Sequence, residues 1–311
     1  MGHSVGFIDD PRFDLHDQGP GHPERPARLT AIREGIENAN LLKRVEHTGA
    51  VPTTMDIIAT LHDPKYVRLA KSTCAHGGLL GDDTHVIPPS WDAALHAAGS
   101  AMHAATQVMT GTWQRAFCAI RPPGHHALFN RAMGFCVFGN IVLAARAAIQ
   151  AGAQRVAIID WDVHHGNGTQ DMVWDDPNIM FASLHQYPFY PGTGSITETG
   201  GPHAPNTIVN CPIAAYEGDD AYLHAWHTRI KPAFERFSPN IVLISAGFDA
   251  EARDPLGQLQ ITPAGFEALS SEVVAFANQA CGGRIVSLLE GGYSLAALRE
   301  TVPLHLATLI D

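Results

Sequence analysis

Short runs of apolar, largely β-branched residues alternate along this chain with longer segments in which apolar residues recur at helical spacing. The apolar runs predict strands at Arg115–Ile120, Val156–Ile159, Phe181–Leu184, Ile208–Cys211, Ile241–Ser245 and Ile285–Leu289. The periodic segments predict helices at 27–39, 64–73, 91–110, 138–151, 166–173, 219–237 and 263–280. Such alternation is typical of βαβ units, whose strands lie parallel in one sheet. We therefore expect an α/β fold with a central, mostly parallel β-sheet flanked by helices.

Reactive side chains follow where several of the predicted strands end. They are Asp160, Asp162, His164, His165, the pair His125–His126, Asp249 and the segment Glu290–Tyr293. In open α/β sheets, ligands bind outside the carboxyl ends of the strands. We therefore expect these side chains to converge on one crevice.

The segment from Asp160 to His165 carries the strongest chemical signal. Asp162 and His164 are two residues apart on an extended segment, so their side chains point to the same side. Carboxylates and an imidazole form the kind of site that catalytic zinc uses when it keeps one coordination position open. Ordinary solvated residues at a strand end are the alternative. The density of ligand-type side chains in this segment favours a metal site.

Length and charge narrow the function further. The chain has 311 residues, and no linker or low-complexity tract divides it, so we expect one domain over residues 1–311. Twenty Lys and Arg residues against 31 Asp and Glu residues give a net charge of -11, with no basic stripe. Because nucleic-acid binding depends on clustered Lys and Arg, we expect no nucleic-acid partner.

Cysteine use and hydropathy indicate the compartment. The five cysteines are scattered and never form a CxxC pair, which is typical of reduced thiols in a cytosolic protein. The N-terminus lacks a basic region followed by an apolar stretch. No apolar run reaches the roughly 18 residues that a membrane span requires. We expect a cytoplasmic protein with no membrane partner.

Several motifs together resemble a known family. They are PPGHH at 122–126, DWDVHHGNGTQ at 160–170, AGFD at 246–249 and EGGY at 290–293. In this order they resemble the zinc-dependent histone deacetylase superfamily, which includes acetylpolyamine amidohydrolases and acetoin-utilisation proteins. The DWDVHHGNG run, with HPERP at 22–26, resembles the class II branch in particular. The resemblance extends over nearly the whole chain and implies the arginase/deacetylase fold.

The resemblance implies a metal centre and an oxyanion donor. Asp162, His164 and Asp249 are its implied ligands for one catalytic zinc ion. Tyr293 is the implied tyrosine whose hydroxyl stabilises the tetrahedral oxyanion. A branch of the family with His at this position is poorly active on acetyl-lysine, so Tyr293 implies a competent deacetylase.

The tandem histidines are implied to flank a zinc-bound water. The resemblance assigns His126 as the general base and His125 as the partner that orients and stabilises. It pairs His125 with Asp160 and His126 with Asn167. Since a neutral Asn does not raise an imidazole pKa as Asp would, we expect His126 to be the more readily neutral of the two.

Residues around the implied substrate tunnel and a structural potassium ion follow from the same resemblance. Phe135 and Tyr190 resemble the aromatic walls that hold a lysine-like chain, and Leu256 resembles the leucine at the rim. Asp82 or Asp83, of which we select Asp83, resembles the carboxylate that grips the substrate backbone. Further implied positions are Gly134 and Gly291 at the substrate, Arg25 in an internal product channel, and Asp160, Asp162, His164, Ser183 and Leu184 around potassium.

The implied reaction is the removal of acetyl or other short acyl groups from the ε-amine of acyl-lysine in proteins or peptides. In it, zinc-bound water attacks the amide carbonyl, assisted by the tandem histidines and Tyr293. The nearest alternative is an acetylpolyamine amidohydrolase, with acetylated polyamines as substrates. A non-catalytic acyl-lysine binding protein is a second alternative, although a pure binder has no need for the full catalytic set. Whether the chain forms a homo-oligomer is left open.

Overall fold

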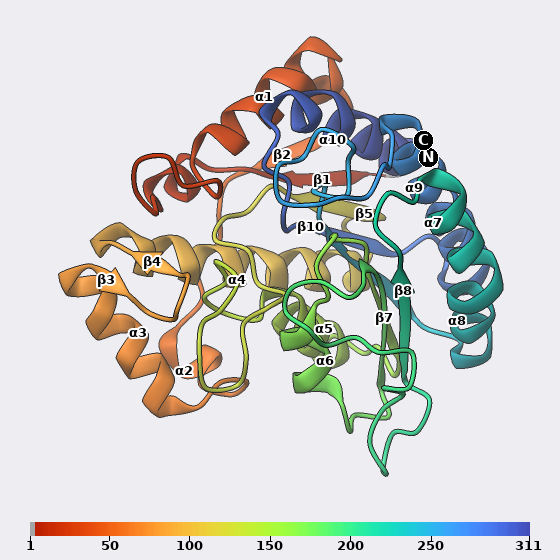
Figure 1. Ribbon diagram of the computed structural model, residues 1–311, viewed down its shortest axis with the longest axis horizontal. Coiled ribbons are helices and arrows are strands. Elements are labelled where there is room, and N and C mark those ends of the chain that lie inside the picture. Colours follow the sequence, from red (N-terminus) through yellow and green to blue (C-terminus); the bar gives the residue numbers. More distant parts are fainter. Residues whose placement is uncertain (1–3) are drawn as a thin grey trace.

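The computed structural model, which describes residues 4–311, is organised around one eight-stranded sheet. All neighbouring strands run parallel, in the order β2-β1-β5-β10-β9-β6-β7-β8 (Figure 1). The strands are β1 (Val5–Ile8), β2 (Glu46–Thr48), β5 (Arg115–Cys118), β6 (Val156–Asp160), β7 (Ile179–Gln186), β8 (Ile208–Ile213), β9 (Ile241–Ala246) and β10 (Ile285–Leu289). The expected single-domain α/β fold with a parallel sheet is confirmed.

Helices cover both faces of this sheet (Figure 1). One layer contains α4 (Pro88–Thr110), α5 (Asn140–Gln150) and α6 (Asn167–Val173). The other layer contains α1 (Ala27–Asn38), α7 (Asp219–Ala225), α8 (Lys231–Phe237), α9 (Pro263–Cys281) and α10 (Leu295–Ile310). Beside α4 lie α2 (Met55–Ile58), α3 (Pro64–His76) and a small antiparallel hairpin of β3 (Gly78–Leu79) and β4 (His85–Val86). Short 3₁₀ turns occupy Pro11–Leu15 and Leu41–Arg44.

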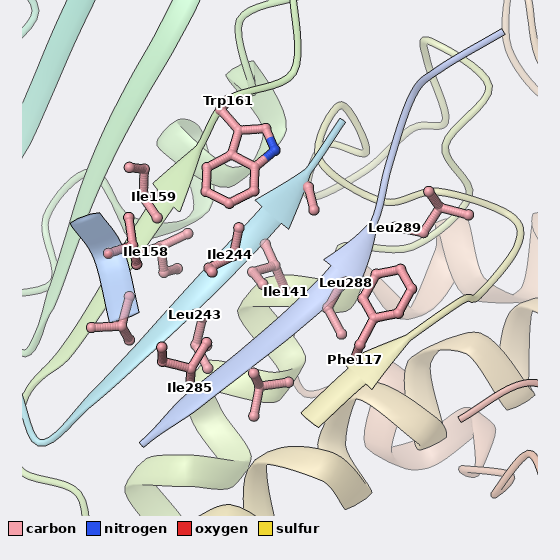
Figure 2. Close-up of a cluster of buried hydrophobic side chains, with 14 of the residues drawn as sticks. Phe117, Ile141, Ile158, Ile159, Trp161, Leu243, Ile244, Ile285, Leu288 and Leu289 are labelled. Carbon is pink, nitrogen blue, oxygen red and sulfur yellow. The ribbon is translucent and has the colours of Figure 1, made fainter. Parts of the chain in front are cut away.

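The centre of the sheet is buried on both faces. Ile158, Ile244 and Leu288 come from three central strands, and Ile141 of α5 packs with them (Figure 2). Each is at most 1% exposed. Burying a side chain of this size stabilises the fold by about 1.5–3 kcal/mol. Close packing of this kind leaves the central strands little freedom, so the positions of their carboxyl ends are fixed.

Prolines explain two differences from the predicted helices. The helix predicted from Trp91 begins at Pro88, because proline is tolerated in the first turn, where its missing N–H has no helical partner. The single helix predicted over 219–237 is interrupted by a π-helical turn at Trp226–Ile230. Pro232 follows this turn and cannot donate the regular i→i−4 hydrogen bond, which accounts for a local change of helical geometry.

Several elements were not predicted, among them β1, β2, α10, α2 and the β3–β4 hairpin. β1 and β2 are only four and three residues long; Gly6 divides the apolar residues of β1, and β2 consists of polar residues. α10 contains Pro303, which normally interrupts a helix, yet it packs between α1 and α9. These elements depend on tertiary contacts more than on local pattern.

Candidate active site

The site lies at the carboxyl edge of the four central strands, β5, β10, β9 and β6. Because these strands are parallel and adjacent, the segments that follow them emerge side by side. Those segments contain the motifs at 121–126, 160–165, 246–249 and 290–293. The fold therefore brings these motifs together at one edge of the sheet, as expected.

Asp162, His164 and Asp249 form a compact cluster of metal-ligand atoms. One atom from each lies within 4.8 Å of the other two. His164 Nδ1 is 3.0 Å from Asp162 Oδ1 and 3.2 Å from Asp249 Oδ2. Both carboxylates are fully buried, and the His164 side chain is 12% exposed. All three polar groups therefore face a common point.

Backbone amides hold the two carboxylates in place. The Val163 N–H donates to Asp249 Oδ1 at 2.8 Å, and the Gly291 N–H donates to Asp162 Oδ2 at 2.8 Å. Gly291 must be glycine here, since a Cβ atom would lie 2.0 Å from Asp249 Oδ2. Asp249 Oδ2 accepts no backbone hydrogen bond from the described residues, and His164 Nδ1 lies 3.2 Å from it. Two buried carboxylates around one imidazole leave a net negative charge that is costly in the interior, so this cradle suits a cation.

The charges of the cluster agree with cation binding. Burial opposes protonation of His164, but its hydrogen bonds to Asp162 and Asp249 outweigh burial and raise its pKa to about 10. Without a metal, the imidazole therefore holds a proton between two carboxylates. Because a metal ligand must be deprotonated, a bound cation would take the place of this proton.

His125 and His126 lie side by side with different partners. Their ring centres are 4.0 Å apart. His125 Nδ1 donates to Asp160 Oδ2 at 3.0 Å, and His126 Nδ1 donates to Asn167 Oδ1 at 2.7 Å. In both rings the Nδ1 proton is held by an acceptor. For a neutral His126, this leaves Nε2 as the proton acceptor.

The two histidines have opposite pKa shifts. Burial lowers the pKa of His126 well below its usual value, and the positive charges of His125 and His164 lower it further. Burial also opposes protonation of His125, but Asp162 and Asp160 outweigh it and raise its pKa well above the usual value. At neutral pH, His126 is therefore neutral and His125 is an imidazolium.

Tyr293 stands beside this centre on the segment after β10. Burial and the negative charge of Asp249 raise the pKa of its phenol, so the hydroxyl stays protonated and able to donate. Its backbone N–H donates to Asp254 Oδ2 at 2.6 Å. The same carboxylate accepts from the N–H of Leu256 at 3.0 Å. Asp254 thus connects Tyr293 to Leu256.

One pocket leads to these groups. Its volume is about 220 Å³, and it is lined by Asp83, His126, Gly134, Phe135, His164, Tyr190, Leu256 and Tyr293. The ring centres of Phe135 and Tyr293 are 6.0 Å apart in an edge-on arrangement. Gly291 is the one expected substrate position outside this lining, because it packs behind the ligand carboxylates.

Comparison with known proteins gives the family. A model of the histone deacetylase domain matches residues 22–309. The chain belongs to the histone deacetylase family. Family membership identifies it as a deacetylase-type amidohydrolase, and the family in general uses a catalytic zinc ion. The expected kind of enzyme is confirmed.

Relatives of the histone deacetylase family match most of the chain. A probable deacetylase of Archaeoglobus fulgidus is 35% identical over 293 residues, covering 94% of this chain and 82% of that protein. The chloroplastic histone deacetylase 14 of Arabidopsis thaliana is 39% identical over 300 residues, covering 90% and 71%. A histone deacetylase-like amidohydrolase of Pseudomonas aeruginosa is 37% identical over 279 residues, covering 89% and 73%.

A solved histone deacetylase structure has the same fold. The crystal structure of the HDA15 HD domain superposes with a TM-score of 0.95 at 36% identity, covering 99% of this chain and 88% of that one.

The helices also bear on membrane insertion. Within residues 4–311, no helix is long and apolar enough to cross a membrane.

Two expectations from the family resemblance have different outcomes in the fold. The register of β6 and β7 pairs Ser183 with Asp160, and the potassium site at these residues stays a prediction. Arg25 is exposed, whereas Arg28 is fully buried near Tyr293. The prediction for Arg25 is therefore wrong, and the buried arginine of this segment is Arg28. Arg28 lies four residues before Ile32, so both side chains are on the buried face of α1. This helical spacing can be read from the sequence.

Three further residues near the site have roles that the sequence analysis did not assign. The carboxylate of Glu290 accepts the N–H of Gly124 at 2.7 Å and of His125 at 3.1 Å, so it fixes the backbone of the tandem histidines. Asp254 holds Tyr293, as described above. The ring of Phe189 stacks on His164 with 5.5 Å between centres. Only Glu290 has a sequence signal, its place in the EGGY motif; the other two depend on loop conformation.

Proposed function

We propose that this protein is a zinc-dependent hydrolase that removes acetyl or other short acyl groups from the ε-amine of acyl-lysine in proteins or peptides. One observation carries the proposal. The Asp162–His164–Asp249 cluster shares a buried site with His125, whose pKa is raised, and His126, whose pKa is lowered. Membership of the histone deacetylase family supports the reaction type.

In this proposal, Asp162, His164 and Asp249 hold the zinc ion. The donor set of two carboxylates and one imidazole is of a kind that catalytic zinc uses, and no backbone amide of the described residues occupies Asp249 Oδ2. When bound, zinc supplies the positive charge that polarises the amide carbonyl and lowers the pKa of a water molecule.

His126 is the proposed general base. It is neutral at neutral pH, and its Nδ1 proton is held by Asn167, so Nε2 can take the proton of the attacking water. His125, oriented by Asp160, keeps a positive charge beside the reacting atoms. After the C–N bond breaks, His126 returns its proton to the leaving amine.

Tyr293 is the proposed donor to the oxyanion. Its phenol is protonated, and it lines the same pocket as His126 and His164. A preorganised donor in a site that excludes water stabilises developing negative charge more than it would in water. The backbone contact to Asp254 keeps the Tyr293 segment in position before substrate binds.

The remaining pocket residues are the proposed walls for the alkyl chain of lysine. Phe135, Tyr190 and Leu256 supply apolar surface, and Gly134 leaves room between them. A structural potassium ion beside Asp160, with Asp162, His164, Ser183 and Leu184, is part of the same proposal. Its support is the family resemblance and the pairing of Asp160 with Ser183.

Direct comparison of substrates tests the proposal. We expect hydrolysis of an acetyl-lysine peptide to exceed hydrolysis of acetylated putrescine and acetylated spermidine at equal concentration. A preference for the polyamines would assign the protein as an acetylpolyamine amidohydrolase. Binding of the peptide without turnover of any of the three, in protein that holds one zinc ion per chain, would assign it as an acyl-lysine binding protein.

A further inference from the structure

Glu24, in the HPERP segment at 22–26, binds two buried arginines. Arg121 contacts both oxygens of its carboxylate, Oε1 through Nε and Oε2 through Nη2 at 2.8 Å. Arg28 Nη1 donates to Oε1 at 3.2 Å, and Gln18 Nε2 donates to Oε2 at 3.1 Å. Glu24 itself is also fully buried. One carboxylate therefore joins two arginines that lie far apart in the sequence.

Stability alone does not account for these buried charges. Moving ions out of water is costly, and replacing a buried ion pair by packed apolar side chains is often neutral or stabilising. Burial opposes ionisation of Glu24, but the charge of Arg121 and the hydrogen bonds around the carboxylate outweigh it and hold its pKa well below the usual value. Glu24 is therefore a carboxylate at neutral pH. Its ion pairs provide a fixed geometry, because a planar guanidinium binds a carboxylate in a defined orientation.

Arg121 begins the segment that carries the tandem histidines, four residues before His125. Glu24 holds this start of the segment. Farther along, the Gly124 and His125 N–H groups donate to the carboxylate of Glu290 at 2.7 Å and 3.1 Å. Two buried carboxylates thus fix the histidine segment, one at its start and one beside the histidines.

Arg28 joins Glu24 to the segment that carries Tyr293. Its Nε donates to the Gly292 carbonyl at 2.6 Å, and its Nη2 donates to the Glu290 carbonyl. Glu290 therefore binds Arg28 through its backbone and the histidine segment through its carboxylate. The contacts close a ring of hydrogen bonds whose members are Glu24, Arg121, the backbone of 122–125, Glu290 and Arg28.

We propose that Glu24 is a positioning residue that closes this ring and so fixes the general base His126 relative to the oxyanion donor Tyr293. Its side chain has no exposed surface and lies outside the lining of the pocket, so it does not touch the substrate. None of the proposed zinc ligands belongs to the ring. Glu24 therefore acts on turnover and not on metal binding. This inference rests on the proposed function, since it concerns two groups that carry out that reaction.

Shortening the side chain by one carbon tests the ring. Glu24→Asp keeps the charge but draws the carboxylate away from the arginines. With an acetyl-lysine peptide, we expect it to lower kcat about 10-fold with little change in KM and one zinc ion still bound, because small misplacements of reacting groups slow turnover. Glu37→Asp, the same change at an exposed position of α1, should alter none of these. Unchanged kcat in Glu24→Asp, or a loss of zinc that matches the loss of kcat, would overturn the proposal.

Arg121→Lys gives a second variant at the other side of the same contact. It keeps the positive charge but loses the planar fork that binds the carboxylate. We expect a loss of kcat similar to that of Glu24→Asp, and about the same loss when the two changes are combined, because both open one ring. Losses that multiply in the double variant would contradict a shared positioning role.

Hydrogen exchange tests the ring without relying on turnover. In the unaltered protein, we expect the Gly124 and His125 amides to exchange as slowly as amides at the centre of β5. They should exchange faster in Glu24→Asp and be unchanged in Glu37→Asp, with thermal denaturation to establish that both variants are folded. Fast exchange of these amides in the unaltered protein, or unchanged exchange in Glu24→Asp, would overturn the inference. Either result would do so even if turnover of acyl-lysine substrates were absent and the proposed function itself had failed.

Discussion

Arg28 lies directly behind Tyr293, with its guanidinium carbon 5.0 Å from the centre of the tyrosine ring. Its Nε donates to the Gly292 carbonyl at 2.6 Å, and its Nη2 donates to the Glu290 carbonyl. The opposite end of the guanidinium contacts Glu24, 3.2 Å away. A buried arginine on α1 therefore supports the segment that carries the proposed oxyanion donor.

Replacing Arg28 should loosen Tyr293. We expect Arg28→Met to lower kcat about 10-fold with a smaller change in KM, because it removes charge-assisted hydrogen bonds to the carbonyls before Tyr293. Arg25→Met is the matched control, since Arg25 is exposed and carries the same charge. Steady-state kinetics on an acetyl-lysine peptide would check this. Equal losses in the two variants would remove the positioning role of Arg28.

Tyr293 itself can be tested with a single-atom change. Tyr293→Phe should reduce kcat roughly 10²–10³-fold if the hydroxyl stabilises the oxyanion. Zinc content and the affinity for a substrate analogue should stay near their original values. Tyr216→Phe removes a hydroxyl from a side chain that is 71% exposed, and it should have no effect. Unchanged turnover in Tyr293→Phe would exclude the role of oxyanion donor.

The partner of His126 sets the pH dependence. Burial and the neighbouring positive charge of His125 lower the His126 pKa, so the base remains neutral and active as pH falls below the usual range of histidine. Asn167→Asp would place a carboxylate on Nδ1, stabilise the imidazolium and raise this pKa. The acid limb of the kcat/KM profile should therefore move to higher pH. A shift to lower pH, or none, would contradict the assignment of His126 as general base.

A buried histidine outside the site should make stability depend on pH. His305 is fully buried between Ser270 and Ser287, each 2.8 Å away, and burial lowers its pKa to about 3. The unfolded chain takes up this proton near pH 6.5, so protonation favours unfolding between pH 6.5 and 3. The stabilisation is complete above pH 6.5 and decreases as pH falls.

Urea denaturation across that pH range would measure the effect of His305. His305→Gln has no titrating group at this position, so its free energy of unfolding should decline less on acidification than that of the unaltered protein. Equal slopes for the two proteins would show that another group is responsible.

Sequence pattern predicts the strands and the chemistry at their ends, because both depend on residues close together in the chain. The run from Val156 into Asp162 and His164 is the clearest case, because both ligands follow directly after the buried strand β6, in the bend that begins past Asp160. The parallel sheet then requires that Asp249 arrive at the same edge. These parts of the site follow from local pattern and one topological rule.

The supporting residues could not be predicted in the same way. Asp254 contacts the backbone of Tyr293, which lies 39 positions away in the sequence, and Asp83 contacts Tyr190, which lies 107 positions away. Such contacts depend on how loops fold back over the sheet, and the hydrophobic periodicity of the sequence does not predict loop conformation. The position of Arg28 could have been predicted in part. It lies four residues before Ile32, and this helical spacing places both side chains on the buried face of α1.

Metal removal and restoration test the central claim most directly. The protein would be dialysed against a chelator, assayed with an acetyl-lysine peptide, and assayed again after addition of zinc, with bound zinc measured at each step. We expect one zinc ion per chain, loss of turnover when it is removed, and recovery when it is restored. Asp249→Asn should neither retain zinc nor recover. Full turnover by the zinc-free protein would contradict the account.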